Sequence, residues 1–186
     1  MRAAVTAMVL ATVLAGCATI QYLPPEQMVV EKVVEAPNVP KAQIFEKSKV
    51  WFARTFRQSM SGWWEPNSSR TVIQYENRDK GLLIANGAIM YPLEHSTDAY
   101  KVGWEVRFTL EEEVRDGKAR VTFSHLTMYI PTAFCGTVYP TSTGSYEKKL
   151  EAEEFGLVKP VFLGLADQLG AYLVAPDKGW QGGDGQ

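Results

Sequence analysis

The chain has 186 residues, 46% of them hydrophobic, which suits a single globular domain. Its 19 Lys and Arg residues nearly balance its 21 Asp and Glu residues, so it lacks the basic excess with which proteins hold nucleic-acid phosphates. Two cysteines are too few for a disulfide-rich scaffold or a four-cysteine zinc site. The composition therefore predicts a folded domain with no nucleic-acid partner.

The N-terminus has the pattern of a secretory signal. Arg2 precedes a small and apolar run over residues 3–15, which is shorter than the roughly 20 residues that cross a bilayer. The run ends in Leu14-Ala15-Gly16-Cys17, which resembles the lipobox of bacterial lipoproteins. The resemblance implies cleavage before Cys17, a diacylglycerol on its thiol, an acyl chain such as palmitate on its new amine, and a lipid-anchored mature protein. An ordinary signal peptide and a short uncleaved anchor are the alternatives.

The residue after Cys17 is Ala18 rather than Asp. By resemblance to the sorting rule of Gram-negative lipoproteins, this favours an outer-membrane anchor with the domain facing the periplasm. Pro24-Pro25 cannot continue a helix and tends to extend the chain. We expect a signal peptide over 1–16, a lipidated tether over 17–25, a single domain over 26–174 and a disordered tail over 175–186.

The predicted elements follow the order strand, helix, four strands, helix. Hydrophobic alternation and turn residues place the strands at 26–35, 71–76, 82–91, 102–114 and 118–130, and apolar stripes place the helices at 41–59 and 160–174. Residues 131–152 are rich in Pro, Thr, Ser and Gly and are expected to form a long loop. Two amphipathic helices on one face of a five-stranded antiparallel sheet give an α+β two-layer sandwich.

The strands at 102–114 and 118–130 alternate between apolar and polar residues, and Asp116-Gly117 between them suits a tight hairpin turn. This pattern predicts one sheet face on a core and one in water. The residues expected on the wet face are Glu105, Arg107, Arg120, Thr122 and Ser124, together with Gln74 and Glu76. Their mixed charge suits a protein or a polar ligand; a face that is only solvated is the other interpretation.

Two local features complicate these strands. The run Glu111-Glu112-Glu113 is expected to be a solvated charge cluster at a strand end. The apolar phase shifts after His125, which a β-bulge near Ser124-His125 would explain. We expect His125 to be half-buried and bonded to backbone; a hydrolase that uses His125 is an alternative.

Several apolar patterns together carry a resemblance to a known family. They are Val29-Val30, Val50-Trp51-Phe52, the segment 81–87 and the strand 105–109. With the order β-α-β-β-β-β-α over residues 26–174, they resemble a family of uncharacterised domains with a TATA-box-binding-protein-like (TBP-like) fold. The resemblance implies that fold and, since the family has no assigned activity, no functional residues. A fold shared with a DNA-binding protein does not imply DNA binding.

The sequence lacks the usual signatures of catalysis. It has no metal-ligand spacing, nucleophile elbow, Walker loop or dinucleotide fingerprint. We therefore expect no enzymatic activity, no metal and no cofactor, and a lipid-anchored domain that contacts an envelope protein through its wet face or the 131–152 loop. The alternative is a small-ligand or glycan binder that uses Trp63 and Trp64, adjacent tryptophans that cannot both face the core of one strand or helix. Packing of both beneath the loop is the other interpretation.

Overall fold

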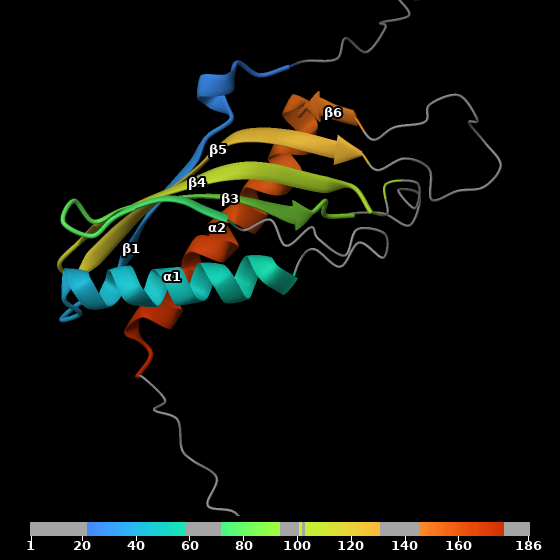
Figure 1. Cartoon of the computed structure of the whole chain (residues 1–186). Coiled ribbons are helices and arrows are strands. Elements are labelled where there is room, and N and C mark those ends of the chain that lie inside the picture. Colours follow the sequence, from blue (N-terminus) through green and yellow to red (C-terminus); the bar gives the residue numbers. More distant parts are fainter. Residues whose placement is uncertain (1–21, 59–71, 94–100, 102, 131–145, 177–186) are drawn as a thin grey trace, which may run out of the picture.

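The computed structural model describes residues 22–58, 72–93, 101, 103–130 and 146–176 (Figure 1). The elements in chain order are η1 (Pro25–Gln27), β1 (Val30–Glu35), α1 (Lys41–Gln58), β2 (Val72–Asn77), β3 (Leu82–Met90), β4 (Glu105–Arg115), β5 (Lys118–Ile130), β6 (Tyr146–Lys149) and α2 (Ala152–Val174). The strands form one antiparallel sheet, and the two helices lie together on one of its faces (Figure 1). The α+β two-layer architecture is therefore confirmed.

The sheet has six strands rather than the five that were predicted. Its order is β1-β5-β4-β3-β2, and β6 also pairs with β5. The long strand β5 serves two partners along the same edge: residues 118–123 pair with β1, and residues 127–130 pair with β6. The prediction of a loop over 131–152 is thus wrong for its last part. The short β6 has no apolar alternation of its own, so its pairing with β5 specifies it.

The core lies between the sheet and the helices. Phe108 of β4 contacts Phe56 of α1 and Phe162 of α2, with ring centroids 5.3 and 5.0 Å apart, and both contacts are edge-to-face. Phe123 of β5 lies 4.7 Å from the ring of Phe162. All five phenylalanines of this cluster, which includes Phe52, are buried. Burial of such large apolar side chains is the main force that holds the two layers together.

Helix α1 agrees with the predicted span to within one residue at its C-terminal end. Its apolar stripe is buried against the sheet and comprises Ile44, Phe45, Trp51, Phe52 and Phe56. Its first backbone N–H, at Lys41, donates to Oδ1 of Asp116 at 2.7 Å. Since Asp116 belongs to the β4–β5 turn, a distant carboxylate satisfies one of the amides that a helix start leaves free.

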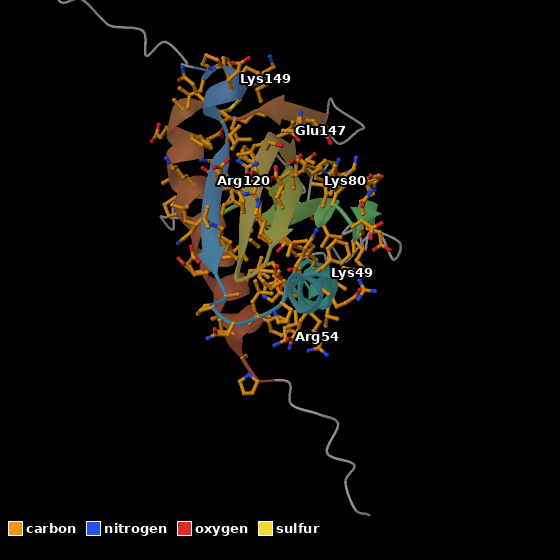
Figure 2. All side chains as sticks on the ribbon, turned by 90° about the vertical axis from the view of Figure 1, so that its left-hand side faces the viewer. Lys49, Arg54, Lys80, Arg120, Glu147 and Lys149 are labelled. Carbon is orange, nitrogen blue, oxygen red and sulfur yellow. The ribbon has the colours of Figure 1, made fainter. Side chains whose placement is uncertain are left out.

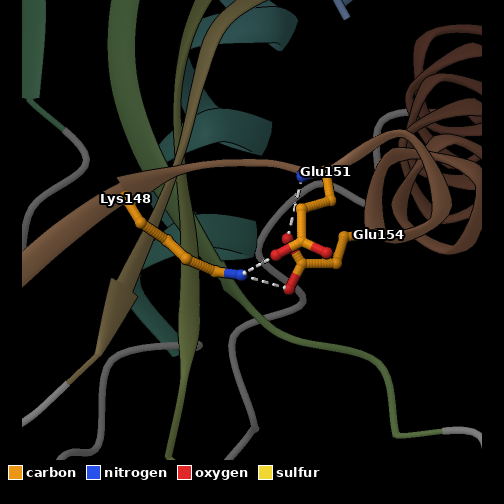
Figure 3. Close-up of polar contacts among 3 residues, drawn as sticks. All are labelled: Lys148, Glu151 and Glu154. Atoms are coloured by element: carbon orange, nitrogen blue, oxygen red, sulfur yellow. Dashed lines mark hydrogen bonds and ion pairs between the residues drawn. The ribbon is translucent and has the colours of Figure 1, made fainter. Parts of the chain in front are cut away.

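Helix α2 begins at Ala152, eight residues before the predicted start, so Pro160 lies inside it. The start is set by Glu154, which accepts a hydrogen bond from the backbone N–H of Glu151 at 3.0 Å, one half of a capping box (Figure 3). Pro160 has no backbone N–H to donate to the carbonyl of Gly156, four residues earlier. Gly156 is exposed, so water can donate to its carbonyl instead. By length and composition α2 could also cross a membrane, yet one stripe of it packs on the sheet as a core helix does.

Lys148 of β6 also binds the first turn of α2. Its Nζ donates to Oε1 of Glu151 at 2.9 Å and to Oε1 of Glu154 at 2.7 Å (Figure 3). Burial alone would lower the pKa of Lys148, but the hydrogen bonds to the two carboxylates outweigh burial and raise it. The contact ties β6 to α2 immediately after the strand ends.

The β4–β5 hairpin has the predicted turn and the predicted bulge. Gly117 has a φ of +77°, the left-handed conformation that a glycine adopts without steric cost. The pairing of β4 with β5 shifts between Arg107 and Thr109, opposite His125, which has a φ of +54°. The expectation that His125 is half-buried is wrong: its side chain is exposed because the bulge turns it outward, and Ser124 Oγ lies 3.0 Å from its Nδ1.

Candidate functional site on the open sheet face

The side of the sheet opposite the helices is the candidate site, and we call it the open face. Its residues alternate with the buried core residues of each strand. They are Glu31 and Val33 of β1, Tyr75 of β2, Ile84, Asn86 and Met90 of β3, Glu105, Arg107, Thr109, Glu111 and Glu113 of β4, Arg120, Thr122, Thr127 and Tyr129 of β5, and Glu147 of β6. The structure thus places the predicted residues Glu105, Arg107, Arg120 and Thr122 on one face.

Arg107 organises the end of the open face beside β6. Its guanidinium carbon lies 3.8 Å from the ring centroid of Tyr129, and its Nη1 forms an ion pair with Oε1 of Glu147. The three residues come from β4, β5 and β6. Nε of Arg107 is buried and has no hydrogen-bond acceptor among the residues that the structure describes. At this end of the face, the Arg107 guanidinium therefore stacks on the Tyr129 ring and keeps one N–H donor, at Nε, without an acceptor in the described structure.

Arg120 organises the other end. Its Nη2 pairs with Oε1 of Glu113, which faces it directly across β4 and β5. The hydrogen bond and the negative charge of Glu113 raise the pKa of the Arg120 guanidinium. Thr122 lies next along β5, opposite Glu111 of β4 and Glu31 of β1. Both predicted arginines are thus paired with glutamates.

The two arginines share the face but do not meet. Glu113, the partner of Arg120, is six residues from Arg107 along β4, which corresponds to about 20 Å at the usual rise of a strand. Figure 2 shows Arg120 and Glu147 at different heights between Lys149 at one end of the molecule and Arg54 at the other. Between the arginines along β4 lie Thr109, whose side chain shares a 3.1 Å hydrogen bond with Asn86 of β3, and then the charged Glu111.

Large apolar side chains lie toward the margins of the same face. Val33 on β1 is 49% exposed, Tyr75 on β2 is 43% exposed and Met90 at the end of β3 is 48% exposed. They lie on three different strands, and no helix in the described part of the chain covers them. Scattered exposed apolar residues are ordinary, and here they share the face with charged residues of β4 and β5.

Two of the residues predicted for this face lie elsewhere or beside an irregularity, and other predicted sites fall outside the described residues. Glu76 does not belong to it: its partner in β3 is the buried Leu83, and its carboxylate pairs with Lys49 of α1 at 2.8 Å. The neighbouring Gln74 is exposed beside an irregularity in β2. Cys17, Trp63, Trp64 and the segment 131–145 lie outside the described residues, so their predicted roles stay predictions.

Sequence reasoning missed a buried acid on the opposite face. Glu112 was expected to be solvated with its neighbours, but its side chain is completely buried beneath α1. Ser48 Oγ donates to Oε1 of Glu112 at 2.7 Å, while Oε2 has no partner in the described structure. Burial raises the pKa of Glu112 to about 8, against a smaller lowering by the Ser48 hydrogen bond. The signal was the strand period, because Glu112 is in phase with the buried Leu110 and Val114.

Within the residues that the structure describes, no three His, Cys, Asp or Glu side chains are grouped so as to hold a metal ion. A cavity of about 450 Å³ lies at the turn end of the sheet, where Lys41, Lys80 and Arg115 meet Glu111, Glu113 and Asp116. Its charges are balanced, and Asp116 is already bonded to the start of α1. We therefore take the open face, and not this cavity, as the candidate binding surface.

This arrangement defines a class: an α+β domain with a TBP-like fold, in which two helices cover one side of an antiparallel sheet. Residues 31–129 match the family described as "Domain of unknown function (DUF4468) with TBP-like fold", and the chain belongs to this family. The resemblance inferred from the sequence is confirmed in this respect. The family has no assigned function, so it supplies no catalytic or binding residues.

A solved structure agrees at the level of the fold. A crystal structure of a DUF4468 family protein from Bacteroides ovatus ATCC 8483 is similar to this chain with a TM-score of 0.50 and 13% sequence identity, covering 81% of this chain and 88% of that one. A TBP-like protein from Parabacteroides distasonis ATCC 8503 gives a TM-score of 0.49 at 13% identity, covering 76% and 91% of the two chains. None of the curated proteins matches the chain.

Proposed function

We propose that this protein is a lipid-anchored envelope protein whose domain is a non-enzymatic binding module that contacts an envelope protein partner. The observation that carries the proposal is the open face, which extends over the sheet and is covered by no helix of the described structure. Antiparallel sheets with one wet face are common. What favours binding here is how charge and apolar surface are distributed over the face.

The distribution suits a protein surface. Charged groups are depleted from the cores of protein interfaces, whereas aromatic residues, Met and Arg are enriched. On the open face the two arginines are paired with Glu113 and Glu147, and Tyr75 and Met90 are exposed toward the margins. Glu31 and Glu111 add negative charge around Arg120. A partner with apolar side chains opposite Tyr75 and Met90, and with cations opposite the glutamates, would therefore fit this face.

The anchor is the second part of the proposal and rests on the sequence. Cys17 of the lipobox-like motif precedes the first described residue, Tyr22, by five positions. Five extended residues span at most about 18 Å. Lipid on Cys17 would hold the domain close to the periplasmic surface of the outer membrane, where its partner would be another envelope protein.

The test is co-purification with the tagged full-length chain from detergent-solubilised envelopes. The test variant carries Arg107→Glu and Arg120→Glu, which reverse the charges of the open face. The matched control carries Arg54→Glu and Lys159→Glu, two exposed cations on the helices. We expect a stoichiometric partner with the wild type and the control, and its loss with the test variant. The Cys17→Ala protein, which should not be anchored, is expected to recover less of it.

Retention of the partner by the test variant would exclude the open face as the interface. Deletion of residues 131–145 in the same assay separates a contact through that segment from one through the face. If no partner is recovered with any form, the proposal of a protein partner fails. Intrinsic tryptophan fluorescence with peptidoglycan fragments then tests the glycan-binding alternative that Trp63 and Trp64 suggested.

A further inference from the structure

Glu112 occupies the centre of the contact between α1 and the sheet. Its carboxyl group is fully buried, accepts one hydrogen bond from Ser48 of α1, and leaves Oε2 without a partner in the described structure. An ionised carboxylate in such a place would have lost its water and regained a single hydrogen bond, which is a large cost. A neutral carboxyl group is far less costly to bury, so docking of α1 favours a bound proton.

The charged side chains that the structure describes on the elements around Glu112 either have other partners or are exposed. Three lysines of α1 have other partners: Lys41 donates to the carbonyl of Asp79 at 2.5 Å, and Lys47 donates to the carbonyls of Leu173 and Ala175. Lys49 forms an ion pair with Glu76. Glu46 and Arg54 of the same helix are exposed. The partners of Glu112 in the sheet are Leu83 of β3 and Val121 of β5, both buried and apolar. On β5, Lys118 and Arg120 belong to the other face and His125 is exposed. Within the described structure, therefore, no cation offsets a charge on Glu112.

The two elements that meet at Glu112 are held with unequal strength. Strand β4 is hydrogen-bonded along both edges, to β3 and to β5. Helix α1 is joined to the rest of the domain by its apolar stripe and by polar contacts at exposed positions, such as those of Lys41 and Lys49. If the carboxyl group must reach water, α1 is the element that can move, because moving β4 would break two ladders of hydrogen bonds.

We propose that the contact of Glu112 with Ser48 is a proton-operated latch, which keeps α1 docked while the carboxyl carries a proton and loosens α1 when the proton leaves to solvent. In the opened form the carboxylate is hydrated and has an ordinary affinity for protons, so opening releases one proton. The population with α1 open should rise about tenfold per pH unit across the range in which Glu112 is neutral when docked and ionised when open.

The experiment is amide hydrogen exchange on the full-length protein between pH 5 and pH 8, corrected for the intrinsic rate at each pH. In the wild type we expect protection of the α1 amides to fall about tenfold per pH unit, and at every pH these amides should be less protected than those in the middle of β5, which exchange only through global unfolding. In Glu112→Gln, which cannot ionise, the α1 amides should lose this dependence. Equal behaviour of the wild type and Glu112→Gln, or α1 amides as well protected as those of β5 at every pH, would overturn the latch, since α1 would then open only with the whole domain.

Two further measurements keep the proposal testable if Glu112→Gln does not fold. In the Ser48→Ala protein, Glu112 keeps its carboxyl group but loses the hydrogen bond from Ser48. Protection of the α1 amides should therefore still fall as the pH rises, and the fall should continue to a higher pH than in the wild type. Carbon-13 NMR of the wild-type glutamate carboxyls should show one group that titrates above pH 7. If every glutamate titrates near its ordinary value, Glu112 carries no proton in the docked state and the latch does not exist.

Discussion

Gly87 of β3 faces Phe108 of β4, and the aromatic ring fills the space that a side chain on Gly87 would need. A Cβ at this position would lie 2.5 Å from Cζ of Phe108 and 2.8 Å from Cε2. The ring cannot easily yield, because on the other side it contacts Phe56, Phe123 and Phe162. The absence of a side chain at Gly87 is therefore part of how the core is packed.

Gly87→Ala should destabilise the domain by about 1–3 kcal/mol, since the methyl group must displace a ring inside a close-packed cluster. The measurement is the midpoint of urea unfolding. Gly164→Ala is the matched control: it lies in α2, nothing stands within 4 Å of its Cβ position, and it should stabilise the domain by about 0.5–1 kcal/mol. Equal effects of the two substitutions would contradict the packing argument.

Arg107→Ala should loosen β6. The substitution removes both the contact with the Tyr129 ring and the ion pair with Glu147, and so the side-chain link between β4 and β6. The expected loss is about 1 kcal/mol, because partly exposed pairs of this kind are individually weak. Hydrogen exchange should show the larger effect, as faster exchange of the β6 amides. Lys149→Ala, an exposed cation on the same strand, should leave β6 protection unchanged.

The start of α2 allows the capping hydrogen bond to be separated from the charge. Glu154→Ala removes the acceptor for the Glu151 backbone N–H and a partner of Lys148, and should cost about 1–2 kcal/mol. Glu154→Gln keeps an acceptor for that N–H and should cost less. Thermal unfolding measures both, and Glu153→Ala, exposed in the same turn, is the control. A Gln variant as unstable as the Ala variant would mean that the charge on Glu154 dominates.

Local patterns predicted most of the sheet and one helix. The strand expected at 118–130 has those bounds, and the hairpin before it forms at Asp116-Gly117, because alternation and turn residues act over a few neighbouring positions. The start of α2 was missed because Pro160 was interpreted as a helix start, when the capping signal lay at Glu151 and Glu154. Strand β6 could not be predicted, since only its pairing with β5 specifies it.

The same limits apply to the candidate site. Alternation placed Arg107 and Arg120 on one face, but Glu147, the partner of Arg107, comes from the strand that no local pattern marked. The burial of Glu112 was predictable in principle. Its strand period places it with Leu110 and Val114, but three consecutive glutamates favoured the expectation of a solvated cluster. Ser48, its hydrogen-bond partner in the described structure, is 64 residues away. Tertiary contacts therefore decide where charge is buried.

Glu112 also makes a prediction for global stability, and its sign follows from proton linkage. The pKa of Glu112 is about 8 in the folded protein against an ordinary 4.5, so between these values the folded state binds a proton that the unfolded state does not. The contribution of Glu112 to stability is thus complete below pH 4.5 and is lost as the pH rises towards 8. The slope from this group is at most about 1.4 kcal/mol per pH unit.

Glu112→Gln should remove that slope, since an amide has no proton to lose in this range. Urea unfolding at pH 5 and at pH 7.5 should show the two proteins closest in stability at pH 5 and the Gln variant clearly more stable at pH 7.5. Glu113→Gln is the control, because Glu113 is partly exposed on the open face and paired with Arg120. If the wild type loses no more stability than the Gln variant between the two pH values, Glu112 is already ionised in the folded protein, and a compensating charge must then lie close to it.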